Sequence, residues 1–345
     1  MTEKGKSNHT YNYGLALLKN IMCFEVVLLH CSDMYDSGVL GWLSYLTSMA
    51  VPVFVIVAFY FTYVTTRKEL GRRMARLYLP MLVWAVIYYI VFKMMAAGAR
   101  LAGSSAADGI DVSINDFFWQ SITGHSPNLN PPLWFNFVLL ILTILVFLLN
   151  KIPERKRTYL LVLLFIAAIF MQYSGINMML FGKLRIELVY SLGRITEMIP
   201  YMIIGIFAQR YLHHIKGVFW IPALISIAVI RYCGIFVNIS EKSFEYAGAE
   251  IMLVSTIIFG LFYQIDGEMI PIVIREVIKK LSSLTMGIYV LHVLVNEVLC
   301  GIRIAFNLNI PKRNAMWALG VYVISGIATF LLSQIVPKKI KQYVM

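Results

Sequence analysis

Apolar segments recur along the whole chain, and short polar stretches separate them. A helix needs about 20 mainly apolar residues to cross a bilayer, and eight segments approach or exceed that length. They are Gly14–Cys31, Gly41–Val64, Leu77–Leu101, Leu133–Leu149, Tyr159–Tyr173, Val218–Val237, Leu284–Ile302 and Ala315–Val336. Two weaker segments, Glu197–Tyr211 and Gly248–Ile265, are short or begin beside a glutamate that a span must hide. The pattern predicts an all-α polytopic membrane protein of about ten transmembrane helices.

The composition agrees with this class. Of the 345 residues, 59% are hydrophobic and 14% charged, and the mean hydropathy is +0.74, which is too apolar for a soluble globule. We find no internal repeat and no appended soluble domain, so residues 1–345 are expected to form a single membrane-embedded domain. The four cysteines lack paired spacing, so neither a disulfide framework nor a metal site is indicated.

The distribution of charge predicts the orientation of the chain. If the N-terminus is cytoplasmic, an even number of spans returns the C-terminus to the cytoplasm, and the inner loops should be rich in lysine and arginine. The inner loops then hold Arg67, Lys68, Arg72, Arg73, Arg76, Lys151, Arg155, Lys156, Arg157, Arg210, Lys216, Arg275, Lys279, Lys280, Lys338, Lys339 and Lys341. The outer loops hold far fewer basic residues and include the acids Asp33, Asp36, Asp108, Asp111 and Asp116. The net charge of +12 therefore reflects topology and requires no nucleic-acid partner.

The first apolar segment carries ionisable residues that a plain membrane anchor would lack. Lys19 and His30 stand eleven residues apart, close to three helical turns, so both project from one face at a separation of roughly 16 Å. Histidine titrates near neutral pH and suits a general base acting on a hydroxyl. The alternative is a helix-end histidine with a simple hydrogen bond, and a lysine that snorkels to the headgroups. Glu25 lies about 120° away from Lys19 and is expected to serve packing.

Two other groups of polar residues could carry chemistry. Arg73 and Arg76 are three residues apart, so on one helix they share a face and could grip phosphates from the cytoplasm, although positive-inside anchoring also explains them. His292 and Asn296 are four apart in a late apolar segment and are expected to hydrogen-bond to each other or to line one cavity. Intramembrane acids and bases also occur in transporters, so these residues alone leave the class open.

The order of these motifs resembles that of the integral-membrane acyltransferase family type 3, within it the surface-polysaccharide O-acetyltransferases. Five motifs occur in sequence and cover most of the chain. They are Lys19 with ten residues before His30, Val51-Pro52-Val53-Phe54, Arg73-Met-Ala-Arg76 followed by Pro80, Leu133-Trp134-Phe135, and Gly287-Ile288-Tyr289 followed by His292. Two positions depart from the family: Lys19 replaces a commoner arginine, and Ala58-Phe59 stand where Ser-Gly is usual, which suggests altered helix packing or acyl-chain size.

The resemblance implies transfer of an acyl group across the cell (plasma or inner) membrane. The donor would be acyl-CoA, in particular acetyl-CoA, bound as a substrate with its phosphates near Arg73 and Arg76; no tightly bound cofactor and no metal are implied. The acceptor would be a hydroxyl on a glycan or lipid-linked saccharide outside. His30 would act as general base or carry the acyl group transiently, and Lys19 would steady the thioester or the charge that develops there. Membrane lipids surround the protein, and nucleic acid is not a partner.

Two rival functions remain from the sequence alone. A transporter or flippase of envelope glycan precursors would also need intramembrane polar residues, but it would normally show paired half-sequences or broken helices, which this chain lacks. A structural or sensory membrane protein would leave Lys19 and His30 without a use. For acceptor contacts we expect the outer loop near Trp119, His125 and Trp134, since aromatic faces suit sugars, unless the two tryptophans only anchor the interface.

Overall fold

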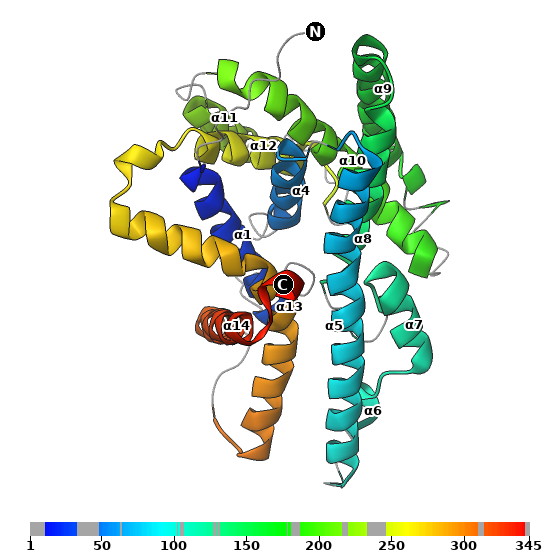
Figure 1. Cartoon of the computed structure of the whole chain (residues 1–345), viewed down its shortest axis with the longest axis vertical. Coiled ribbons are helices and arrows are strands. Elements are labelled where there is room, and N and C mark those ends of the chain that lie inside the picture. Colours follow the sequence, from blue (N-terminus) through cyan, green and yellow to red (C-terminus); the bar gives the residue numbers. More distant parts are fainter. Residues whose placement is uncertain are drawn as a thin grey trace.

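Helices account for all the regular structure in the part of the chain that the computed structural model describes (Figure 1). That part comprises residues 11–32, 48–62, 64–101, 103, 107–126, 129, 132–177, 179–180, 187–215, 220–232, 246–309 and 314–341. Five helices are long and apolar enough to cross a membrane, and three more are apolar but shorter. The protein is therefore an all-α polytopic membrane protein, as the sequence predicts.

Each of the ten predicted segments coincides with one helix. These helices are α1 (Tyr13–Cys31), α4 (Ala50–Tyr60), α5 (Arg67–Leu101), α8 (Trp134–Leu149), α9 (Glu154–Tyr173), α10 (Glu187–Tyr211), α11 (Trp220–Tyr232), α12 (Ala249–Tyr263), α13 (Ile272–Ala305) and α14 (Ala315–Ile335). The predicted bounds at Gly41, Val218 and Val237 lie outside the described residues. Short helices connect the long ones: α6 (Ala107–Ile110), α7 (Ile114–Thr123), α15 (Lys338–Lys341), and the 3-10 turns η2 (Leu212–His214) and η4 (Gly267–Met269).

Three helices begin well before the apolar segments that predicted them. Helix α5 starts at Arg67 rather than Leu77, α10 at Glu187 rather than Glu197, and α13 at Ile272 rather than Leu284. The added turns of α5 and α13 are rich in basic residues, which end an apolar segment without ending a helix, because lysine and arginine are good helix formers. The first turns of α13 run away from the body of the protein in Figure 1.

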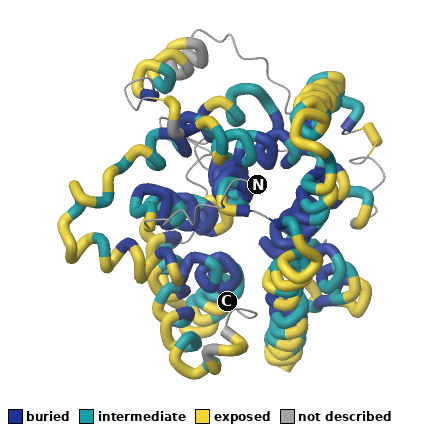
Figure 2. Tube along the Cα trace, turned by 45° about the horizontal axis from the view of Figure 1, so that its top comes forward, coloured by how far each residue is buried: buried dark blue, intermediate teal, exposed yellow. Residues whose placement is uncertain are grey.

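The outer helices expose one apolar face and bury the other (Figure 2). On α5 the exposed side chains include Val86, Ile90 and Met94, spaced four residues apart, while Tyr88 and Phe92 are buried. This spacing places the two sets on opposite faces of one helix. The exposed apolar faces form the surface that a bilayer covers, since lipid tails are as apolar as these side chains.

Helix α1 lies inside the bundle and packs against α4, α12, α13 and α14. Its first turn is capped by Asn12, whose side-chain oxygen accepts a hydrogen bond from the Leu15 amide at 2.8 Å. The amide nitrogen of Asn12 donates to the Tyr263 carbonyl, which ties α1 to the end of α12. A buried helix can hold ionisable side chains only against other protein groups or a cavity, which is the position of Lys19 and His30.

A glycine sets the close approach of α4 and α10. A Cβ placed on Gly205 of α10 would lie 2.6 Å from the Ile56 carbonyl oxygen and 3.0 Å from the Phe59 side chain of α4. Phe59 is fully buried in this contact, at one of the two positions where the sequence departs from the motif of the family that it resembles. The small residue that permits close packing is therefore on the neighbouring helix.

Candidate active site

The polar face of α1 lies along α13. Lys19 Nζ is 3.3 Å from Ser282 Oγ, and the rings of His30 and His292 have centroids 5.3 Å apart. Ser282 and His292 are ten residues apart on α13, nearly the spacing of Lys19 and His30 on α1. The two helices therefore run parallel along this seam, and the predicted pair of α1 residues meets a matching pair on α13.

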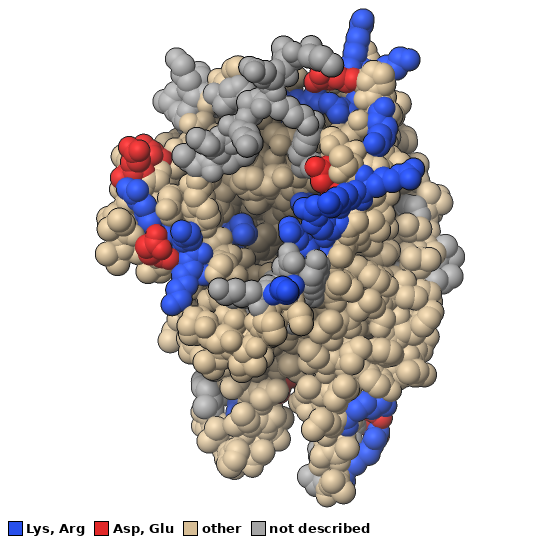
Figure 3. Space-filling view, viewed as in Figure 1, with Lys and Arg blue, Asp and Glu red and all other residues tan. Residues whose placement is uncertain are grey.

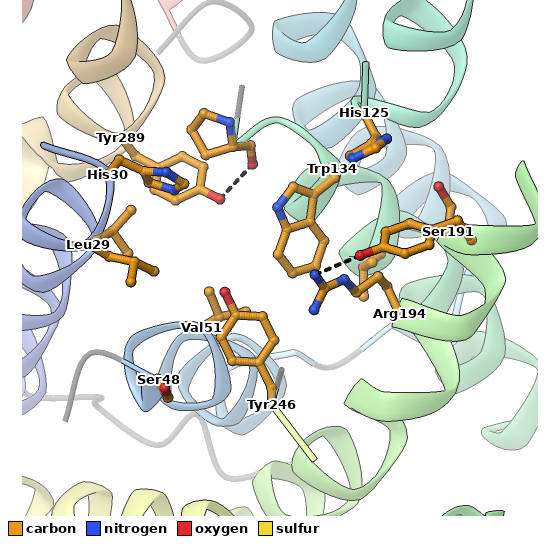
Figure 4. Close-up of a pocket in the computed structure, with 14 residues that line it drawn as sticks. Leu29, His30, Ser48, Val51, His125, Trp134, Ser191, Arg194, Tyr246 and Tyr289 are labelled. Atoms are coloured by element: carbon orange, nitrogen blue, oxygen red, sulfur yellow. Dashed lines mark hydrogen bonds between the residues drawn. The ribbon is translucent and has the colours of Figure 1, made fainter. Parts of the chain in front are cut away.

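His30 also lines a cavity of about 400 Å³, a volume in the range of small-molecule sites. In Figure 4, His30 and Tyr289 lie on one side of it, and Trp134 and Arg194 face them from the other. The lining comes from α1, α4, α8, α10 and α13 and from the segments before α4, α8 and α12. Its residues are Val26, Leu29, His30, Ser48, Val51, His125, Pro132, Trp134, Val138, Tyr190, Ser191, Arg194, Tyr246 and Tyr289.

The chain enters this cavity from α7 through a sharp turn. Helix α7 ends at Gly124, which has φ 70°, a conformation that glycine adopts without strain. A Cβ at this position would lie 2.4 Å from the Leu133 carbonyl group, so the turn packs too closely against the start of α8 for any residue but glycine. His125 follows at once and lines the cavity. Of the three outer-loop residues proposed for acceptor contacts, His125 and Trp134 line the cavity, while Trp119 lies on α7.

The wall opposite His30 is built around a buried arginine. Arg194 is 8% exposed, and its guanidinium carbon lies 5.1 Å from the ring centroid of Trp134 and 5.4 Å from those of Tyr190 and Tyr246. Its Nη1 is 3.4 Å from a carboxylate oxygen of Glu197, which is fully buried. The ion pair and the ring faces compensate a charge that would otherwise be costly to bury.

Sequence reasoning did not find Arg194 or Tyr246. Arg194 and Glu197 are three residues apart in an apolar segment, and that spacing alone could have indicated an ion pair that buries both charges. Tyr246 precedes α12 in a polar stretch without a recognisable motif. Its backbone amide donates a hydrogen bond to Glu197, and its carbonyl accepts one from Tyr201 at 2.6 Å, contacts that arise only in the folded chain.

Hydrogen bonds fix α13 beside the cavity. Tyr289 donates from its hydroxyl to the Pro132 carbonyl at 2.6 Å, and Tyr88 of α5 donates to the Val290 carbonyl at 2.7 Å. His292 is fully buried one turn further along. The predicted alternative of a His292–Asn296 hydrogen bond is not what the structure shows, because Asn296 bonds to Trp317 at 2.8 Å and to Glu297 at 3.2 Å.

The two arginines of α5 have different surroundings. Arg73 is half-buried, and its guanidinium donates to Thr143 Oγ1 on α8 at 3.3 Å and to the Ala58 carbonyl on α4 at 3.4 Å. Arg76, one turn later, is exposed. Figure 3 shows lysine and arginine side chains beside a hollow in this face of the molecule. Neither arginine lines the cavity that contains His30.

The remaining predicted residues can also be placed. Lys19 lies beside Ser282 and outside the lining of the cavity. Glu25 is half-buried, and within the described ranges its Oε2 has no hydrogen-bond partner. In those same ranges, no three His, Cys, Asp or Glu side chains gather in a way that would hold a metal ion.

Comparison with known proteins gives one finding. A family model described as an acyltransferase domain matches residues 12–336, nearly the whole chain. No curated protein and no solved structure matches the sequence.

Proposed function

The chain belongs to this acyltransferase family and is a membrane acyltransferase, and from this premise we propose that it transfers an acetyl or related acyl group from cytoplasmic acyl-CoA to a hydroxyl of an envelope or surface-polysaccharide sugar outside the cell membrane. The observation that carries the proposal is the position of His30. It is a titratable side chain on a buried helix that faces a cavity large enough for a sugar hydroxyl and a thioester. An intramembrane ionisable residue in such a place is a functional candidate.

The proposed reaction needs only a base and a source of charge stabilisation. A ring nitrogen of His30 takes the proton of the acceptor hydroxyl as the oxygen attacks the thioester carbonyl. The new carbon–oxygen bond forms, the carbon–sulfur bond breaks, and the departing CoA thiolate takes the proton from His30. The products are an ester and CoA. In the other route, the His30 nitrogen attacks the thioester itself and then passes the acyl group to the hydroxyl.

The two substrates approach from opposite sides of the membrane in this proposal. Arg73 and Arg76 bind the CoA phosphates on the cytoplasmic side, where arginine's planar donors suit phosphate oxygens. Lys19 lies between that side and His30, about three helical turns from His30 and outside the lining of its cavity, so its charge acts on the anionic donor along its path rather than on the thioester beside His30. The hollow bordered by basic side chains in Figure 3 supports an anionic donor at this face.

The acceptor enters from outside, against the wall opposite His30. Trp134 and Tyr246 are stacked with centroids 6.0 Å apart, and such rings pack against the apolar faces of sugars. Because the charge of Arg194 is paired with Glu197, this wall suits a hydroxyl-rich acceptor without a carboxylate. This feature supports a glycan acceptor.

A label-transfer experiment tests the proposal. Purified protein in membranes receives labelled acetyl-CoA and extracted envelope glycan, and the wild type is compared with His30→Ala. The variant should transfer label at least about 100-fold more slowly, the usual contribution of a general base. His214→Ala, at an exposed position in η2, is the matched control and should keep the wild-type rate.

The same assay contains the outcomes that would contradict the proposal. Undiminished transfer in His30→Ala would remove the base from the mechanism. No transfer in the wild type, together with movement of glycan across the membrane, would support a transporter. Acylated protein trapped in the absence of acceptor, and lost in His30→Ala, would select the acyl-carrier route.

A further inference from the structure

His292 holds one ring nitrogen in a fixed hydrogen bond and leaves the other unused. Its Nδ1 lies 2.8 Å from the Tyr289 carbonyl oxygen and 3.3 Å from the Ile288 carbonyl oxygen. Carbonyl oxygens only accept, so Nδ1 carries the hydrogen and donates. In the neutral ring, Nε2 is then an acceptor. It is buried, and within the described residues it has no hydrogen-bond partner.

A buried acceptor without a donor is unusual enough to need an explanation. More than about 90% of buried polar groups in proteins find a partner, and an unsatisfied one costs about 1–3 kcal/mol. Packing of α13 does not supply the explanation, because the bonds of Nδ1 already fix the ring and Tyr88 and Tyr289 already tie the helix to its neighbours. A hydrogen-bond donor next to Nε2 of His292 would explain why this nitrogen is left without a partner.

The nearest functional group is His30. The two ring centroids are 5.3 Å apart with 40° between the ring planes. Two imidazoles joined by a linear N–H···N bond of about 2.9 Å have centroids roughly 5 Å apart, so the rings already stand at hydrogen-bonding separation. We expect a rotation of the His30 side chain to complete the bond, because catalytic hydrogen bonds commonly tighten only with substrate present.

We propose that His292 is a positioning residue for His30: its Nε2 accepts a hydrogen bond from one N–H of the His30 ring and thereby directs the other ring nitrogen into the cavity. This inference rests on the proposed acyl transfer. The bond fixes the tautomer of His30, so that the nitrogen facing the acceptor hydroxyl is the unprotonated one. When His30 takes the hydroxyl proton, the same bond becomes charge-assisted and stabilises the imidazolium, as the orienting partner does in a serine-protease triad.

The acceptor property of His292 can be removed and restored by substitution. His292→Leu keeps an apolar side chain of similar size but has no acceptor, whereas His292→Gln returns a carbonyl oxygen near the position of Nε2. We expect kcat for acyl transfer to fall about 10- to 100-fold in His292→Leu, the usual cost of losing an orienting partner, with KM for both substrates within about twofold. His292→Gln should recover a large part of kcat. Equal loss in both variants would overturn the proposal.

A double-mutant cycle separates positioning from a structural role. If His292 acts through His30, then adding His292→Leu to His30→Ala should not slow the residual reaction further. A further loss of the same size as in the wild-type background would mean that His292 acts independently, which would overturn the proposal. His292→Phe, which keeps a ring without nitrogen, replaces His292→Leu in both measurements if the leucine variant does not fold.

The outcomes also distinguish this inference from the function on which it rests. A wild-type rate in His292→Leu, with transfer lost in His30→Ala, would reject the positioning role and keep the acyltransferase proposal. Transfer that does not depend on His30 would reject both. Thermal unfolding of each variant in detergent should show His292→Leu folded, so that its lower kcat is read as a loss of orientation.

Discussion

Arg73 and Arg76 belong to one motif, but their contacts differ. The guanidinium of Arg73 donates hydrogen bonds to Thr143 and to the Ala58 carbonyl, so Arg73 joins α5 to α8 and α4. Arg76 is exposed and remains accessible to a ligand. Loss of Arg73 would therefore weaken both the fold and any donor site, whereas loss of Arg76 would affect the donor alone.

Replacing Arg76 gives a test of donor binding at the level of a single residue. In Arg76→Ala we expect KM for acyl-CoA to rise by about 10-fold, because one charge-assisted contact to phosphate contributes about 1.5–3 kcal/mol and part is lost to solvent. KM for the acceptor should stay unchanged. Arg72→Ala is the matched control, since Arg72 is equally basic and exposed but lies on another side of the helix. An equal rise of KM for acyl-CoA in both variants would mean that Arg76 has no specific donor contact and only contributes to the positive charge that orients the chain in the membrane.

At the residue scale, the sequence predicts which side chains share one face of a helix, because helical spacing is fixed. The distance from Lys19 to His30 places both on one face, and the structure brings both against α13. It cannot predict contacts between distant segments. The meeting of His30 with His292, and of Glu197 with the amide of Tyr246, depends on how the helices assemble.

Helix α5 ends in a small ionic cluster that joins it to the segment between α6 and α7. Asp111 accepts hydrogen bonds from Lys93 at 2.6 Å and from Arg100 at 2.5 Å. Lys93 and Arg100 are seven residues apart, two turns of one helix, so a single carboxylate holds both. These contacts, the Lys93 bond foremost, keep the pKa of Asp111 below its ordinary value of about 3.9.

The lowered pKa of Asp111 makes this cluster sensitive to acid. A carboxylate with a depressed folded-state pKa stabilises the fold above its unfolded pKa, and the contribution is lost as the pH falls through the folded value. We therefore expect Asp111→Asn to lower the unfolding temperature by a few degrees at pH 7, with the gap to wild type narrowing as the pH falls below about 4 and closing only below the folded pKa of Asp111. Asp108→Asn, whose carboxylate lies 3.8 Å from Arg100 and is 93% exposed, should change little. A gap that does not narrow at all as the pH falls below about 4 would contradict this assignment.

At the element scale, the length of each apolar segment predicts that a helix is present, but it does not predict the residues at which the helix begins and ends. Each predicted span became a helix because a bilayer leaves few alternatives for a long apolar segment. The starts of α5, α10 and α13 were missed, because a helix can continue beyond the apolar segment that predicts it. The close contact at Gly205 was also not foreseen, because a glycine in an apolar segment does not reveal which helix will approach it.

For the whole molecule, the charge pattern predicts that both termini face the cytoplasm. Single cysteines introduced into a chain without its four native cysteines test this with a membrane-impermeant maleimide applied to intact cells. Asp108→Cys, outside, should be labelled at once, and Lys156→Cys, inside, should be labelled only after lysis. Both positions are exposed. The reverse labelling pattern would show the opposite orientation in the membrane and place Arg73 and Arg76 on the side away from the proposed acyl-CoA.

The ten residues between Lys19 and His30 act as a ruler inside the molecule. Because α1 is packed along α13, its two functional ends are held in phase by helix geometry alone: each residue adds about 100° and 1.5 Å. Substitutions within the segment leave that phase intact, but a single insertion or deletion would turn His30 about 100° away from the cavity and from His292. Across evolution, the stretch should therefore vary freely in which apolar residues it contains while its length stays constant.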